Sequence, residues 1–312
     1  MHISDVTLCC IDNQFTELGF DALRKSTKFL TFEKVIYFTS SEFIEKNNDL
    51  RSLILIPVDH IRSLEDYSNF MIKELNKYIK TKHCIIVQWD GFIVHPELWN
   101  PDLLSYDYVG APWPTKEGLV VGNGGFSLRS KKLLDALQDD AIVSKHPEDQ
   151  CICLENRSFL ETTYGVIFAP SNLAQQFAFE LQKPDFECFG FHAVCNLPLV
   201  LSTKDLLNLI KKLPPKLIFT VQFSLFIETC QSLNSDEVMT TLKKQILMLT
   251  QGMNDELISS RLYRHIIKTC TRRKLHRLAF DTLWNRIRIT GWNADAIFLL
   301  VRIYSHKLLH RF

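Results

Sequence analysis

The first two hundred residues alternate short apolar runs with segments of helical periodicity. Nearly continuous apolar runs, which are typical of strands buried on both faces, occupy residues 6–11, 35–38, 53–56 and 84–87. Residues 17–28 and 66–80 predict helices between them. This β-α-β-β-α-β order predicts an α/β fold with a mixed, mainly parallel sheet flanked by helices.

The polar turn after Val87 is a candidate site on topology alone, because parallel sheets bind ligands at the carboxyl ends of their strands. Further along, residues 131–137 predict a helix and residues 167–169 predict a short strand. Pro147 and the two acids after it predict a helix start, since proline and acids favour the first turn.

The pattern changes near residue 200, where glycine becomes rare and Leu, Ile, Lys and Arg dominate. Residues 203–312 predict five or six helices, with breaks at Pro214–Pro215, near Gly252 and at Gly291. Residues 275–304 have the pattern of a helix-turn-helix repeat of the tetratricopeptide type. We therefore predict an α/β domain over 1–198 and an all-α domain over 199–312.

Charge separates the same two parts, although the whole 312-residue chain has a formal charge of only +1. Residues 1–200 contain 18 Lys and Arg against 27 Asp and Glu, and residues 201–312 contain 18 against 8. The net charges are therefore −9 and +10. A basic helical tail suits anionic lipid headgroups or the acidic first part, and nucleic-acid binding through Arg272, Arg273 and Lys274 is the weakest hypothesis.

Cysteine usage and the N-terminus predict a cytoplasmic protein, which the basic tail could hold at the inner face of a membrane. The nine cysteines are odd in number, and several lie in apolar runs, where cysteine acts as a small hydrophobe. Residues 1–5 lack the basic and apolar regions of a signal peptide, and no apolar run approaches the ~20 residues of a membrane span.

Three short motifs carry candidate chemistry, and each has an ordinary structural interpretation beside it. Asp90, directly after a predicted strand, suits a divalent cation and a diphosphate, or simply a turn. The Gly-rich segment 122–126 suits close approach of a ligand, or a hairpin turn; it lacks the features of a P-loop or dinucleotide fingerprint. Glu148 and Asp149 suit proton transfer, or helix capping.

His192 and the aromatic residues complete the candidates. His192 is a potential metal or phosphate ligand, although a lone histidine beside aromatics is more often a packed one. One or two rings of an aromatic group could stack on a sugar or base, while the others belong to the core. This group consists of Trp89, Trp99, Tyr106, Tyr108 and Trp113.

The order of these motifs resembles a bacterial family of glycosyltransferase-like proteins, formerly described as a domain of unknown function and often found with polysaccharide-synthesis genes. The resemblance covers residues 5–195, and its most specific part is the string Gly-Asn-Gly-Gly-Phe-Ser-Leu-Arg-Ser at 122–130. That family is similar to the GT-A superfamily, which has a Rossmann-like fold and uses nucleotide-sugar donors. The resemblance therefore implies a GT-A-like fold for this chain.

The resemblance also implies roles for single residues. Asp90 and His192 would hold a divalent cation, Mn²⁺ or Mg²⁺, although Gln88 replaces the first acid of the Asp-x-Asp motif and weakens the case for metal dependence. Asp149, with Glu148 beside it, would supply the catalytic base. Donor and acceptor binding would fall to Asp12, Gln88, Trp89, Trp113, Asn123, Gly124 and Gly125.

The implied function is transfer of a sugar from a nucleotide-diphosphate donor, with a UDP-sugar favoured, to a glycan or glycolipid acceptor in surface-polysaccharide synthesis. Asp149 would take a proton from the acceptor hydroxyl in an inverting, direct displacement. The alternative is a catalytically degenerate protein that binds a nucleotide sugar and recruits partners through its helical tail, and Gln88 keeps this alternative open.

Overall fold

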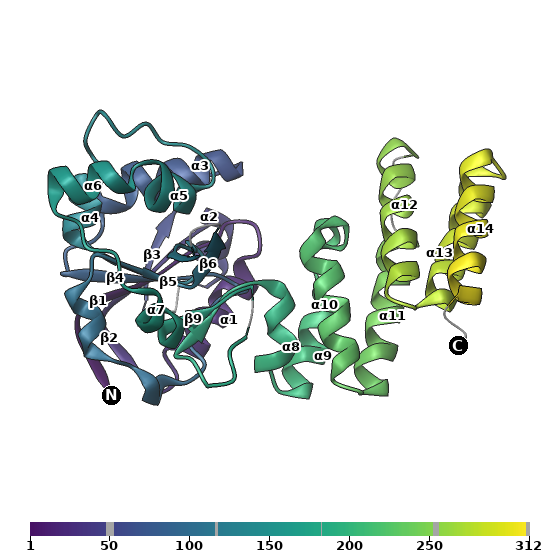
Figure 1. Cartoon of the computed structure of the whole chain (residues 1–312), viewed down its shortest axis with the longest axis horizontal. Helices are drawn as coiled ribbons and strands as arrows, with labels where there is room; N and C mark the ends of the chain where they lie inside the picture. The colour runs from purple at the N-terminus through teal and green to yellow at the C-terminus, as the bar shows by residue number, and fades with distance from the viewer. Residues whose placement is uncertain (48–52, 116–117, 182, 252–255, 310–312) are drawn as a thin grey trace. The chain divides into compact units, whose positions relative to one another are not determined.

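The chain divides into two compact units, Met1–Ala193 and Val194–Phe312 (Figure 1). The computed structural model describes residues 1–47, 53–115, 118–181, 183–251 and 256–309. The change in sequence character predicts a boundary between residues 198 and 199, and the division of contacts falls five residues earlier.

The first unit is built on a six-stranded sheet of order β3-β2-β1-β4-β8-β5. Its strands are β1 (His2–Ile11), β2 (Thr31–Thr39), β3 (Ile54–Pro57), β4 (His83–Val87), β5 (Tyr108–Gly110) and β8 (Ser127–Ser130). The first four strands pair in parallel, and β8 runs antiparallel to both β4 and β5. The predicted mixed α/β fold with a mainly parallel sheet is therefore confirmed.

The centre of this sheet is buried on both faces. Residues 6–10 of β1 and all of β4 are buried, which is what their continuous apolar runs predict. Cys9 and Cys10 are fully buried and pack as small apolar side chains. The register aligns Cys10 with Val87, so both strands end at the same edge.

Helices connect the parallel strands and cover both faces of the sheet. The chain passes outward from β1 to β3 through α1 (Thr16–Ser26) and α2 (Ser41–Lys46), then returns to β4 through α3 (Leu64–Asn69). Because such crossovers are right-handed, α1 and α3 lie on opposite faces. Figure 1 shows α3 grouped with the later helices α4, α5 and α6.

Two details of these connections differ from the predicted pattern. The predicted order lacks α2, a six-residue helix that Ser40 caps by accepting a hydrogen bond from the Phe43 N–H. The predicted helix over 66–80 is helical but changes pitch, since α3 continues as a π-helical turn at Phe70–Glu74 and a 3₁₀ turn at Leu75–Lys77.

The rest of the first unit consists of short elements around the sheet. Its helices are α4 (Lys131–Ala136), α5 (Glu148–Gln150), α6 (Arg157–Tyr164) and α7 (Ser171–Phe177). Two small sheets pair β6 (Pro112–Thr115) with β7 (Gly118–Val121), and β9 (Ala178–Phe179) with β10 (Gly190–Phe191). The strand predicted over 167–169 is reduced to a single bridge between Phe168 and Tyr108.

The second unit is helical in its described residues. It contains α8 (Leu197–Val200), α9 (Thr203–Lys211), α10 (Val221–Ser232), α11 (Asp236–Gln251), α12 (Glu256–Arg272), α13 (His276–Thr290) and α14 (Ala294–Leu309). The predicted break at Gly291 is confirmed, with φ at +71°, and the break near Gly252 lies outside the described residues. Among the described helices, none combines the length and apolar character that a bilayer crossing requires.

Candidate functional site

A cleft of about 290 Å³ opens where β1 and β4 end. Because the two strands are parallel neighbours, Asp12 and Gln88 follow them at the same edge of the sheet. The predicted site residues that line this cleft are Asp12, Gln88, Trp89, Gly125, Glu148, Asp149 and His192. Asp90, Asn123, Gly124 and Trp113 are outside its lining.

Asp12 follows the last residue of β1 and lines the cleft. Its Oδ1 accepts hydrogen bonds from the backbone N–H groups of Gln14 and Phe15, at 2.9 and 2.7 Å. Burial raises the pKa of Asp12 to about 6; the two N–H groups oppose this rise and the charge of Asp90 adds to it. The carboxylate is thus positioned by the backbone and suited to accept a hydrogen bond from a ligand.

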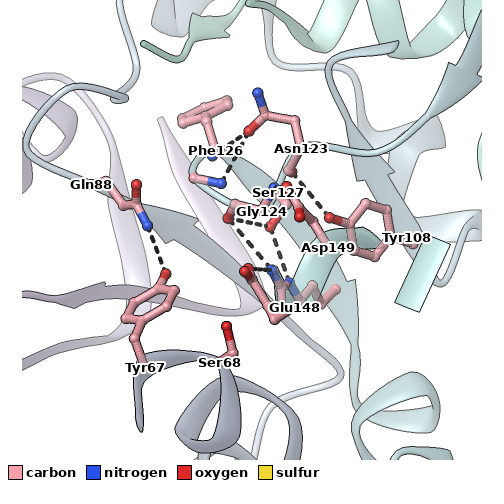
Figure 2. A network of polar contacts seen from close by, with 12 residues as sticks. Tyr67, Ser68, Gln88, Tyr108, Asn123, Gly124, Phe126, Ser127, Glu148 and Asp149 are labelled. Atoms are coloured by element: carbon pink, nitrogen blue, oxygen red, sulfur yellow. Dashed lines mark hydrogen bonds and ion pairs between the residues drawn. The ribbon is translucent and has the colours of Figure 1, made fainter. Parts of the chain in front are cut away.

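Gln88 bridges two side chains at the end of β4. Its Nε2 donates to the Tyr67 hydroxyl at 2.7 Å (Figure 2), and its Oε1 lies 3.1 Å from Nε2 of His192. Its backbone also closes a tight turn with Gly91 through two hydrogen bonds. An amide serves both partners at once, since it can donate and accept, which a carboxylate in the same place could not do.

His192 is held between two carboxylates. Its Nε2 lies 3.6 Å from Oδ1 of Asp90, and its Nδ1 lies 3.3 Å from Oε1 of Glu180. Burial alone would lower the pKa of His192, but the two carboxylates raise it to about 10. Nδ1 also lies 3.2 Å from Nδ2 of Asn123, and Nε2 lies 3.1 Å from Oε1 of Gln88, so both ring nitrogens have side-chain partners.

The predicted metal pair of Asp90 and His192 is in contact, with Oδ1 of Asp90 3.6 Å from Nε2 of His192. Among the described residues, no three His, Cys, Asp or Glu side chains are grouped so that they could hold a metal ion. Because both ring nitrogens of His192 are engaged by side chains, the residues as placed do not fit a cation held through His192. Divalent-cation dependence stays a prediction.

The Gly-rich segment lies so close to charged side chains that it has no space for a Cβ. A Cβ on Gly124 would stand 1.9 Å from Oε1 of Glu148, and one on Gly125 would stand 2.1 Å from Nε2 of His192. Asn123, at φ +64°, accepts the N–H groups of Gly125 and Phe126 on its Oδ1. Of the three residues predicted from this segment, Gly125 lines the cleft, while Asn123 and Gly124 lie behind it and hold the segment in place.

Two of the predicted aromatic residues have different positions. Trp89 lines the cleft and contacts Phe15 edge to face, with ring centroids 5.7 Å apart. Trp113 packs against Gly122 and donates from Nε1 to Oε2 of Glu180 at 3.0 Å. Trp89 is thus available to a ligand in the cleft, while Trp113 supports the Glu180–His192 pair from outside it.

The two predicted catalytic acids have different partners. Glu148 accepts from Nη2 of Arg129 at 2.9 Å, and the two side chains are buried, at 7% and 0% exposed. Burial raises the pKa of Glu148, and the Arg129 charge opposes that rise. Asp149 accepts from the Gly124 N–H at 3.0 Å and lines the cleft. Glu148 is therefore a structural partner, and Asp149 is the acid available for proton transfer.

Sequence reasoning missed the residues that hold this site together. Arg129 donates from Nε to Ser127 Oγ at 3.1 Å, and Ser127 in turn donates to the Gly124 carbonyl. Tyr67 fits the helical pattern of 66–80 and is therefore predicted as a packed helix residue with no role for its hydroxyl. Glu180 belongs to no motif. The one signal for Arg129 in the sequence is that a charged side chain stands in the short strand just before residue 131.

Comparison with known proteins gives one family model that matches part of the chain and carries no function. Residues 51–192 match a family model described as a protein of unknown function (DUF5672). Curated proteins provide no match. The matched segment contains Gln88, the Gly-rich loop, Glu148, Asp149 and His192, but not Asp12. The function of the cleft must therefore be argued from its chemistry.

Replacing Glu148 by Gln should lower the free energy of unfolding by about 3–5 kcal/mol, because Arg129 would stay buried without a counter-charge. The double variant R129M/E148L removes both charges and should regain most of that loss. Urea denaturation measures both values. A double variant no more stable than E148Q would contradict the role given to this ion pair.

Replacing Asp12 by Asn should raise the melting temperature at pH 8 more than at pH 4. A carboxyl whose pKa is higher in the folded chain stabilises it below its unfolded pKa, and this contribution is lost as the pH rises through about 6. Asn keeps the acceptor for the two N–H groups and escapes that loss. The exposed Asp102→Asn is the matched control, and a gain of equal size at both pH values would refute the explanation.

Proposed function

We propose that the first unit is a GT-A-type glycosyltransferase that moves a sugar from a nucleotide-diphosphate donor to a hydroxyl of a glycan or glycolipid. The observation that carries the proposal is the convergence of Asp12, Asp149 and His192, which are far apart in the chain, on one cleft. That cleft lies at the carboxyl edge of a mainly parallel sheet, where α/β folds bind ligands. The sequence resemblance supports the same class.

The proposed binding site for the nucleotide part of the donor lies on the β1 side of the cleft. Phe15 and Trp89 present aromatic surface that suits a nucleoside base, since base and ring faces attract each other. Asp12 lies beside Phe15 and would accept a hydrogen bond from a base N–H or a ribose hydroxyl. A uridine diphosphate sugar is the donor that we favour.

The chemical step that we propose is a direct displacement with Asp149 as the general base. Its carboxylate takes the proton of the acceptor hydroxyl while that oxygen forms a bond to the anomeric carbon. The bond from the anomeric carbon to the diphosphate breaks, and the leaving nucleoside diphosphate keeps the electron pair. The Gly124 N–H orients Asp149, and the Arg129–Glu148 pair holds the adjacent residue.

Asp149→Asn should lower kcat by about 10²–10⁴-fold, the usual contribution of a positioned base. Asn can still accept the Gly124 N–H, so folding and donor binding should be retained. Turnover of a verified donor–acceptor pair measures the effect, with Asp102→Asn as the control. Near-normal turnover by D149N would end the assignment of Asp149.

A panel of nucleoside diphosphates and their sugars, read by thermal shift, tests the donor site without an acceptor. A ligand at a hundredfold excess over Kd adds about 2.7 kcal/mol of stability. Trp89→Ala should remove most of the shift, and runs with and without Mn²⁺ test the predicted cation dependence. No shift with any nucleotide would refute the proposal.

Binding without turnover would instead favour the alternative, a protein that recognises a nucleotide sugar and recruits partners. The observation behind this alternative is Gln88, whose amide is occupied by Tyr67 and His192. Donor hydrolysis by the purified protein separates the two, because only a transferase activates the anomeric carbon.

A further inference from the structure

The outer face of α14 is apolar. Ile297, Val301, Tyr304 and Leu308 are each between 51% and 61% exposed. Their spacing of i, i+4, i+7 and i+11 places them in one stripe along the helix. The face that packs on α12 and α13 carries the buried residues Ala296, Leu299 and Ile303.

The exposed stripe of α13 combines aromatic and basic side chains. Arg277, Phe280, Trp284 and Arg288 recur at i, i+3, i+7 and i+11, and both arginines are exposed. Eleven residues of helix separate the two arginines by about 16 Å along the axis. Asp281 lies on the same side and is half-buried.

Ring contacts join the two stripes into one surface. Phe280 contacts Tyr304 at a centroid distance of 6.4 Å and Trp284 at 6.2 Å. Trp284 also contacts Trp292, which is 55% exposed. We call the α13 and α14 stripes, together with Trp292, the aromatic-basic surface.

The electrostatic surroundings of this surface are strongly positive. Residues 263–309 contain ten Lys and Arg against two Asp and Glu. Of these two acids, Asp295 is paired with Arg264 and Arg286. Within the described residues, Arg277, Arg288 and Lys307 form no ion pair and remain available to an external anion. The positive charge of this surface would also repel the same surface of a second copy of the chain.

We propose that the aromatic-basic surface docks on an anionic lipid bilayer. Trp and Tyr favour the level of the headgroups, where a ring is partly buried and its polar edge stays wet. Arg and Lys side chains reach anionic headgroups from the same level while their alkyl stems cover apolar surface. The aromatic-basic surface combines both features, since its exposed aromatic rings are flanked by arginines that form no ion pair within the described residues. The proposal is independent of the reaction in the first unit.

Vesicle binding by the full chain tests the electrostatic part. The protein should sediment with phosphatidylcholine vesicles that contain about 30 mol% of the anionic lipid phosphatidylglycerol, and it should not sediment with pure phosphatidylcholine vesicles. The variant R277E/R288E should bind at least about 25-fold more weakly, since each basic residue near the surface contributes about fivefold. K243E/K244E, which reverses two exposed charges on α11, is the matched control. An equal loss in the control would overturn the proposal.

Tryptophan quenching by brominated lipid locates the contact. Trp284 and Trp292 should be quenched on vesicles, and W284F/W292F should lose the quenching while vesicle binding persists. Trp284→Ser with Tyr304→Ser should weaken binding about tenfold or more, because apolar burial is lost. Binding without quenching would overturn the proposal. If the chain forms a dimer and the two serine substitutions dissociate it, the proposal would likewise be overturned, because a second copy would then cover this surface.

Discussion

The buried ion pair between Arg129 and Glu148 is the interaction on which the cleft depends. Arg129 comes from β8, inside the sheet, and Glu148 begins the helix that carries Asp149. The pair therefore ties the acidic turn to an interior strand of the central sheet. Such a pair contributes little net stability compared with apolar residues, but losing one partner is costly. Here the ion pair fixes the position of the turn that carries Asp149.

The Gly-rich segment 122–126 also holds the acidic turn in place. Gly124 lies against Glu148 and Gly125 against His192, so two charged side chains pack directly on peptide groups. The carbonyl of Gly124 accepts from Ser127 while its N–H donates to Asp149. One residue without a side chain thus connects the core strand to the acid that faces the cleft. Any larger residue there would force Glu148, and with it Arg129, to move.

The sequence predicts the local part of this structure well and the long-range part poorly. The runs at 6–11 and 84–87 could be identified because strands buried on both faces must be continuously apolar, and their shared edge located the cleft. The helix α2 was missed because six residues carry too little periodicity. Arg129, Glu180 and Tyr67 were missed because their partners lie 19, 12 and 21 residues away, in positions that only the folded chain brings together.

The order of the strands has a consequence for how the unit can be divided. β1 is an interior strand that separates β2 and β3 from β4, β8 and β5. The segment that matches the family model starts at residue 51 and so contains β3 and β4 but neither strand between them. Expressed alone, that segment would expose the unpaired backbone of β4 along one side and would lack the Asp12 wall of the cleft. The fifty residues before the matched segment therefore supply both the interior strands of its sheet and one wall of its cleft.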